Sequence, residues 1–231
     1  MKNKLLWIIT LLPTIVTCVI IPFMNDKIPM HYDAIGNIDR WGSKYENFIF
    51  PVIIIAMTLF WKLILNYFRK KQVKNQDEKT IKEAEQNEKV IYYTAIGMAI
   101  LFGIMHYAMM YSSILETKNN MENMAIDINL VTNIVMGVFL IIIGNIVPKS
   151  KMNSIVGVRT IWSMKNDITW AKSNRFGGIS LILSGLLIIF ESAFIGGFKS
   201  TIVMLAIIIV DGIVLTIYSY QISKKYGEKL V

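Results

Sequence analysis

The sequence predicts an all-α, polytopic membrane protein with six transmembrane helices and both termini in the cytosol. Its composition, its apolar runs and the distribution of its charges lead to this prediction. Hydrophobic residues make up 54% of the 231 residues and charged residues 17%, and the mean hydropathy of +0.50 is too high for an ordinary soluble domain. The net charge of +8 does not indicate nucleic-acid binding, because the Lys and Arg residues cluster between apolar runs instead of along one soluble face.

Six apolar runs are each close to the roughly 20 residues that a helix needs to cross the hydrocarbon of a bilayer. They cover residues 5–22, 48–68, 90–115, 128–147, 176–195 and 201–220. The first is interpreted as a span and not a signal peptide, because no small-residue cleavage pattern follows it. The short link 196–200 predicts that the last two spans form an antiparallel hairpin. Ser180 and Ser184 offer a small-residue surface for close helix packing.

The orientation follows from the Lys and Arg residues outside the spans. Eighteen lie in the N-terminus, segments 69–89 and 148–175 and the tail, whereas five lie in the alternate segments. This positive-inside bias predicts a cytosolic loop 148–176 and an outer loop 23–47. The predicted units are an N-terminal two-span unit (1–68), a charged cytosolic connector (69–89) and a four-span unit (90–231). The connector is expected to extend a neighbouring helix or to stay mobile as a solvated charge run.

The cytosolic loop carries an unusual combination of arginine and tryptophan. Arginine suits bidentate capture of a carboxylate or phosphate, and tryptophan suits the headgroup layer, so the loop either binds a ligand or anchors to lipid. Asn166 is expected to cap a short helix from 167 to 176, which Gly177 and Gly178 would stop. The candidate residues of this motif are Asn153, Gly157, Arg159, Thr160, Trp162, Trp170, Asn174, Arg175 and Gly178.

The outer loop contains a second group of candidates. His31, Asp33 and Asp39 are of types that ligate metals or bind cations, but their spacing matches no metal motif, so no metal site is predicted. The alternatives are a compact loop held by Asp–backbone and Asp39–Arg40 contacts, or a ligand-facing surface. The candidate residues for a ligand-facing surface are Pro29, His31, Asp33, Gly36, Asp39 and Trp41.

Four ionisable residues lie within the spans and are functional candidates by default: Lys62, His106, Glu191 and Asp211. Lys62 is near enough to the end of its span to reach the headgroups. A pair between His106 and Glu191 is geometrically allowed, although a neutral histidine bonded to a backbone carbonyl is favoured. Asp211 is near the middle of its span, so it should be protonated, paired or facing a polar cavity, and Lys62 is its best partner by depth.

Two motifs carry a resemblance to known proteins. Residues 28–44, IPMHYDAIGNIDRWGSK, resemble a short N-terminal domain of unknown function found in a bacterial membrane family. Residues 157–178, GVRTIWSMKNDITWAKSNRFGG, resemble the signature of the SdpI family. The chain departs from the family pattern at Ile161, where proline is common, and at Asn174, where histidine is common.

The resemblance implies an integral membrane immunity protein that protects its cell against a secreted peptide toxin. It also implies signalling, because the founding type recruits a cytosolic DNA-binding repressor to the membrane. By topology, the outer loop would meet the peptide and the cytosolic motif would capture the repressor or have a structural role. The implied partners are the bilayer, a peptide toxin and a repressor, with no cofactor and no direct nucleic-acid binding.

Two other classes of function are alternatives to an immunity protein. A small proton- or ion-coupled transporter would use Asp211, Glu191 and His106, with a polar path lined by residues such as Asn129, Asn133 or Asn145. A membrane hydrolase is disfavoured, because the chain has two histidines, far apart, and no Gly-x-Ser-x-Gly elbow. No catalytic residue is therefore predicted.

Overall fold

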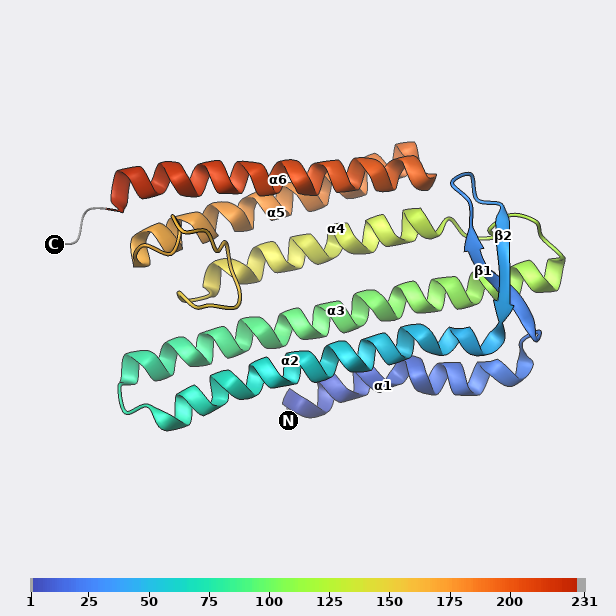
Figure 1. Cartoon of the computed structure of the whole chain (residues 1–231), viewed down its shortest axis with the longest axis horizontal. Helices are drawn as coiled ribbons and strands as arrows, with labels where there is room; N and C mark the ends of the chain where they lie inside the picture. Colours follow the sequence, from blue (N-terminus) through green and yellow to red (C-terminus); the bar gives the residue numbers. More distant parts are fainter. Residues whose placement is uncertain (1, 228–231) are drawn as a thin grey trace.

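The computed structural model describes residues 2–227 and consists of six long helices (Figure 1). All six are long and apolar enough to cross a membrane. The all-α polytopic fold predicted from the sequence is therefore confirmed. The helices are α1 (Lys2–Ile20), α2 (Ile49–Lys74), α3 (Glu78–Asn119), α4 (Ile128–Ile146), α5 (Asp167–Ile195) and α6 (Gly197–Tyr226). Residues 228–231, part of the tail used for the orientation, lie outside the described residues.

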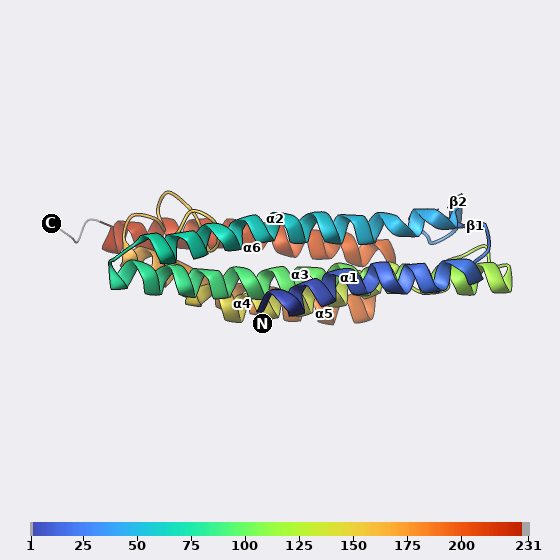
Figure 2. The ribbon, with the colours of Figure 1, turned by 90° about the horizontal axis from the view of Figure 1, so that it is seen from below.

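The six helices form two groups that lie side by side. One group contains α1, α2 and α3, the other contains α4, α5 and α6, and the two meet mainly where α3 packs against α4 (Figure 1). Figure 2 shows the bundle as a flat slab, with α2 and α6 in one layer and α1, α3 and α4 in the other. We call the end that carries segment 150–166 the loop end and the opposite end the hairpin end.

The charged connector 69–89 extends two helices, which was one of its two expected forms. Helix α2 continues to Lys74, and α3 begins at Glu78 after Asp77, whose side chain accepts a hydrogen bond of 2.9 Å from the Thr80 N–H. Such an N-cap satisfies a backbone donor that the first turn leaves free. Arg69 and Glu88 join the two extensions by an ion pair of 2.8 Å.

Segment 23–47, which the charge distribution predicts to be an outer loop, contains an antiparallel β-hairpin that was not predicted from the sequence. Strands β1 (Lys27–Tyr32) and β2 (Ile38–Ser43) pair across the hairpin end of the bundle (Figure 1). Ile28 is fully buried and packs with residues at the ends of α1 and α3. The hairpin is thus a cap anchored by apolar burial.

Helix α5 does not stop at Gly177 and Gly178, so the predicted short helix was wrong. It runs unbroken from Asp167 to Ile195, because a backbone inside a membrane must satisfy its own hydrogen bonds. The role of Gly178 is close packing against α4. A Cβ on Gly178 would lie 2.4 Å from the Gly144 carbonyl oxygen.

A second glycine pair repeats this contact two turns away. A Cβ on Gly185 would lie 2.5 Å from the Gly137 carbonyl oxygen, so α4 and α5 touch through their backbones at two points. Small residues permit this approach in membrane helices. The glycines, more than Ser180 and Ser184, therefore provide the close α4–α5 contact. The link between α5 and α6 is also shorter than predicted, because α6 begins at Gly197.

Candidate functional site

The loop end is organised around Asn174, a fully buried residue in the second turn of α5. Its Oδ1 accepts a hydrogen bond of 2.7 Å from the Val158 N–H, and its Nδ2 donates to the Trp170 carbonyl at 3.0 Å. Trp170, also buried, donates from Nε1 to the Ser150 carbonyl at 2.9 Å. Trp170 and Asn174 therefore hold the start of the loop at Ser150 and its middle at Val158. Asn166 caps α5 as expected, accepting from the Thr169 N–H.

Glycine is required at position 157 for two reasons. Its φ of +122° lies in a region that side chains disfavour, and a Cβ there would lie 2.6 Å from Asn174 Oδ1 and 2.8 Å from the Trp170 ring. The neighbouring Asn153 accepts hydrogen bonds from the Ile155 and Val156 N–H groups and so forms a tight turn. These residues build the loop's shape.

Hydrogen bonds also tie the loop to α3 and α6. The Asn87 side chain on α3 accepts from the Lys151 N–H at 2.9 Å. Across the loop, the hydroxyls of Thr160 and Ser219 are 2.8 Å apart, and the Trp162 and Tyr220 rings meet edge to face at 5.3 Å. The loop therefore bridges the two helix groups at this end.

The sequence analysis missed Ser163, although it is fully buried at the centre of the loop. Its hydroxyl donates to the Val158 carbonyl at 2.6 Å and accepts from the Thr160 N–H at 2.9 Å. The spacing Thr160-x-x-Ser163 was the available signal, because such hydroxyls readily bond nearby backbone.

The predicted motif thus divides into residues that hold the loop in place and residues that are exposed. The residues that build or brace the loop are Asn153, Gly157, Thr160, Trp162, Trp170 and Asn174. Gly178 instead packs against α4. In contrast, Arg159 and Arg175 are exposed, and so is the Ile161 side chain, with an exposed fraction of 79%. These three are free to meet a partner.

At the other end, the acidic candidates of segment 23–47 bond to other residues of the same segment. Asp33 accepts hydrogen bonds from the Ile35 and Asn37 N–H groups and from the Asn37 amide, and the last bond contributes most to lowering the pKa of this carboxyl. Gly36 has a φ of +94°, as this turn requires. The expected Asp–backbone contacts are therefore present, in a compact turn.

The other expected hairpin contact was wrong. Asp39 pairs with His31, with 2.6 Å between Oδ1 and Nδ1, whereas Arg40 reaches Glu46 at 3.4 Å. Among the described residues, no group of three His, Cys, Asp or Glu side chains is arranged to hold a metal ion. Of the remaining candidates, Pro29 is buried and Trp41 is 48% exposed.

A buried carboxylate anchors the hairpin to α3. Glu116 has no exposed surface, and its two oxygens accept from the Tyr32 hydroxyl and the Ala125 N–H, both at 2.8 Å. Burial of the phenol and its bond to this carboxylate raise the pKa of Tyr32. The sequence analysis missed Glu116 because it placed the end of the third span at 115.

Both ends of the chain resemble known protein families. Residues 149–219 match the model of the SdpI/YfhL protein family. Residues 8–55 match the model of a domain of unknown function, DUF1648. Over 224 residues the chain is 23% identical to the immunity protein SdpI of Bacillus subtilis (strain 168), with 97% of each chain covered. No solved structure matches.

These matches confirm the resemblance predicted from the two motifs. With the six helices of span length, they show a multi-pass protein of the bacterial cell membrane. The SdpI/YfhL match contains the loop, α5 and Ser219, which braces the loop. The DUF1648 match contains the hairpin and most of α1.

The polar residues within the spans pair differently from the predictions. Asp211 accepts a hydrogen bond from the Ser180 hydroxyl across the α5–α6 contact, whereas the Lys62 ammonium lies 5.5 Å from the centre of the Trp7 ring. The Lys62–Asp211 pair was therefore wrong. His106 bonds the Thr17 hydroxyl at 2.8 Å instead of a backbone carbonyl or Glu191.

Glu191 belongs to a polar cluster near the hairpin end of α4, α5 and α6. Its Oε1 accepts from the Ser200 hydroxyl at 3.1 Å, and that hydroxyl accepts from Asn133 Nδ2 at 2.6 Å. Its Oε2 is buried and has no hydrogen-bond partner among the described residues. Asn129 joins the cluster through Thr201, whereas Asn145 bonds its own helix.

Proposed function

We propose that this is an integral membrane immunity protein that protects its cell against a secreted antimicrobial or toxin peptide. The observation that carries the proposal is similarity along almost the full chain to a protein named for immunity, with 97% of each chain covered. Both family matches occur in the expected order, hairpin domain first. The positive-inside bias supports placing the hairpin outside the cell.

The hairpin end is the proposed surface for the peptide. It exposes apolar side chains that a soluble environment would disfavour, including Phe23 at 86%, Ile35 at 85% and Trp41 at 48%. A pocket of about 420 Å³ lies beside it, lined in part by Met30, Met109 and Phe198. Methionine-rich surfaces adapt to varied apolar partners, which suits a membrane-active peptide.

The loop end is the proposed surface for a cytosolic repressor. Arg159 and Arg175 are exposed, as is Ile161, and the scaffold around Asn174 fixes the loop that carries Arg159 and Ile161. An arginine fork binds carboxylates in a bidentate manner, so the partner would present an acidic group beside an apolar one. Recruitment of this partner would report toxin binding to the cell.

A survival assay with a separate signalling readout tests both surfaces. A sensitive host carrying the protein or an empty vector is challenged with a secreted toxin peptide from the source organism, and the candidate repressor is measured in the membrane fraction. Trp41→Ala should lower survival, whereas Arg159→Ala should leave survival intact and reduce recruitment. Lys82→Ala, an exposed change on α3, should alter neither. Normal membrane insertion with no protection by the unaltered protein would contradict the immunity function.

A transporter remains the second candidate because of Glu191. Its Oε2 is buried and unpartnered among the described residues, whereas its Oε1 accepts from Ser200, which in turn accepts from Asn133. A carboxylate within a membrane protein often relays protons. Collapse of the proton gradient with an ionophore distinguishes the two functions. Export would lose protection under the ionophore and in Glu191→Gln cells, whereas capture of the peptide would withstand both.

A further inference from the structure

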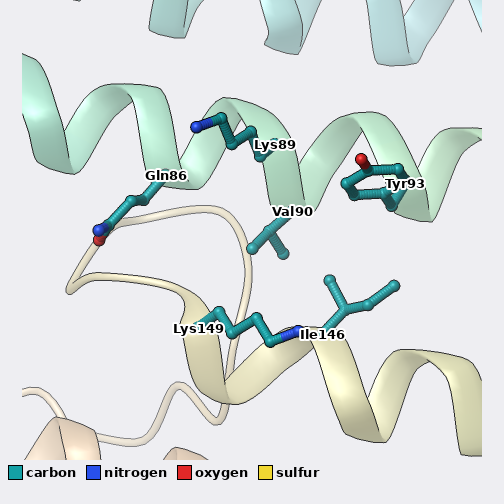
Figure 3. A pocket seen from close by; sticks show the side chains of 6 residues that line it. All are labelled: Gln86, Lys89, Val90, Tyr93, Ile146 and Lys149. Carbon is teal, nitrogen blue, oxygen red and sulfur yellow. The ribbon is translucent and has the colours of Figure 1, made fainter.

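The contact between α3 and α4 contains two pockets in line, which we call the seam pockets. The first, at the loop end, has a volume of about 580 Å³ and is lined by Gln86, Lys89, Val90, Tyr93, Ile146 and Lys149 (Figure 3). Val90 and Ile146 point toward each other across it (Figure 3). The second pocket has a volume of about 170 Å³ and only apolar linings, among them Gly97, Ile104, Val138 and Ile142.

The two pockets occupy one continuous stripe on each helix. On α3 the lining residues recur at intervals of at most four positions from Gln86 to Ile104. The facing residues run back along the antiparallel α4, from Lys149 just after its end to Ile134. From Tyr93 to Ile104 the stripe is about 16 Å long at 1.5 Å per residue. One leaflet supplies about half of the 30 Å hydrocarbon thickness. The apolar stretch therefore has the length of one leaflet.

The loop end of the stripe has the charge of an anion site. Lys149 is exposed and takes part in none of the ion pairs found among the described residues. Lys89 pairs with Glu85 at 2.7 Å, but both side chains are half exposed, so this pair is weak. An ammonium group has three donors, which leaves Lys89 able to bind a second acceptor. Tyr93 is 53% exposed and adds an aromatic ring of the kind found at headgroup level.

We propose that the seam binds one anionic phospholipid. Its headgroup phosphate would contact Lys89 and Lys149, and one acyl chain would lie along the apolar stripe toward Ile104. Basic pockets between transmembrane helices are suited to such headgroups. A small soluble anion would leave the apolar pocket unused, whereas a neutral lipid would leave the two ammonium groups without a counter-charge.

The position of the lipid gives it a structural task. The groups α1–α3 and α4–α6 meet mainly at α3 and α4, and the seam pockets show that this contact is incompletely filled by protein. An acyl chain in the seam would contact both groups and complete their packing.

Native mass spectrometry and lipid titration of the full-length protein test this proposal. The protein is purified in mild detergent and titrated with phosphatidylglycerol or phosphatidylcholine. It should retain one phosphatidylglycerol. Lys89→Gln with Lys149→Gln should weaken phosphatidylglycerol binding about 25-fold, since a lysine near a membrane surface contributes about 1 kcal/mol, or about fivefold. Lys82→Gln, on the same helix and paired with Glu78, is the control.

A second pair of variants tests the acyl groove without changing charge. Val138 is 44% exposed on the second pocket, so Val138→Trp should fill the groove and displace the lipid while the protein remains folded. Ile213→Trp places the same bulk on an exposed part of α6 and should retain the lipid. Phosphatidylglycerol that stays bound in the double lysine variant, or that is lost equally from either control, would overturn the proposal. Equal binding of phosphatidylcholine would also do so.

Discussion

Replacing Asn174 with alanine should release the loop while leaving the helices intact. The Val158 N–H would lose its partner, and an unsatisfied backbone group of this kind costs about 1–3 kcal/mol. If the closed loop is destabilised by about 2 kcal/mol, the population of the open loop rises about 30-fold. The six helices should persist, because the change removes no contact between them in the membrane interior.

Limited trypsin digestion in detergent measures this population. Lys151, Arg159 and Lys165 are exposed cleavage sites in the loop, and cleavage follows the open population when reclosing is fast. Mass spectrometry should show cleavage after Arg159 about 30-fold faster in Asn174→Ala. Ile168→Ala, an exposed change on the same helix, is the matched control. Equal rates in the two variants would refute the role of the Asn174 amide.

Three further predictions follow from the packing and the ends of the bundle. Gly144→Leu should lower the free energy of unfolding in detergent by about 1–3 kcal/mol, because the new Cβ would lie 2.5 Å from the Gly178 carbonyl oxygen. Gly212→Leu is the control and should not lower it, because a Cβ there would have no atom within 4 Å. The raised pKa of Tyr32 means that its contribution to stability is full below its ordinary pKa of 10.0 and is lost as pH rises through the folded-state value. Tyr32→Phe should therefore cost about 1 kcal/mol at neutral pH and remove this alkaline loss in a pH series of unfolding curves. An impermeant thiol reagent should label Ile35→Cys in intact cells and Lys165→Cys only after permeabilisation, and the reverse would refute the orientation.

The membrane fold was predictable because each transmembrane helix contains its own run of apolar residues in the sequence. Runs of about 20 apolar residues need no knowledge of their partners, and each of the six runs overlaps one of the six helices. The helix starts were less well predicted, because α3 and α5 begin at Glu78 and Asp167, well before the apolar runs at 90 and 176. Asn166 was likewise recognised as an N-cap, because that signal lies within four residues of sequence.

The errors came from contacts between distant segments. Gly177 and Gly178 together look like a helix stop, but in the structure both allow close packing: Gly178 lies against Gly144 on α4, and Gly177 lies against Val158 in the loop. Asp211 was assigned the partner of matching depth, but its neighbour in space is a serine on the adjacent helix. The depth of a residue in the membrane is only one of its coordinates. Its partner also depends on which side of the helix its side chain leaves from, and the sequence alone did not reveal this for Asp211.

The sequence indicated many residues of the loop, but it did not indicate Ser163 or which of the residues are buried. Arg159 and Trp170 are both conspicuous in the sequence, yet Arg159 is exposed and Trp170 is buried. The distinction depends on the path of the loop, which is set by Gly157 and by the Asn174 amide. Neither the backbone conformation of Gly157 nor the hydrogen bond to the Asn174 amide produces a periodic pattern in the sequence.

The two glycine pairs have a mechanical consequence. Gly137 meets Gly185 and Gly144 meets Gly178, and the two contacts are seven residues apart on both helices. A slide of one helix turn would set side chains against backbone at both points, so α4 and α5 are locked in one register. A conformational change that couples the hairpin end to the loop end must therefore move α4 and α5 together as one rigid body. Such a rigid-body movement would take place at the α3–α4 interface.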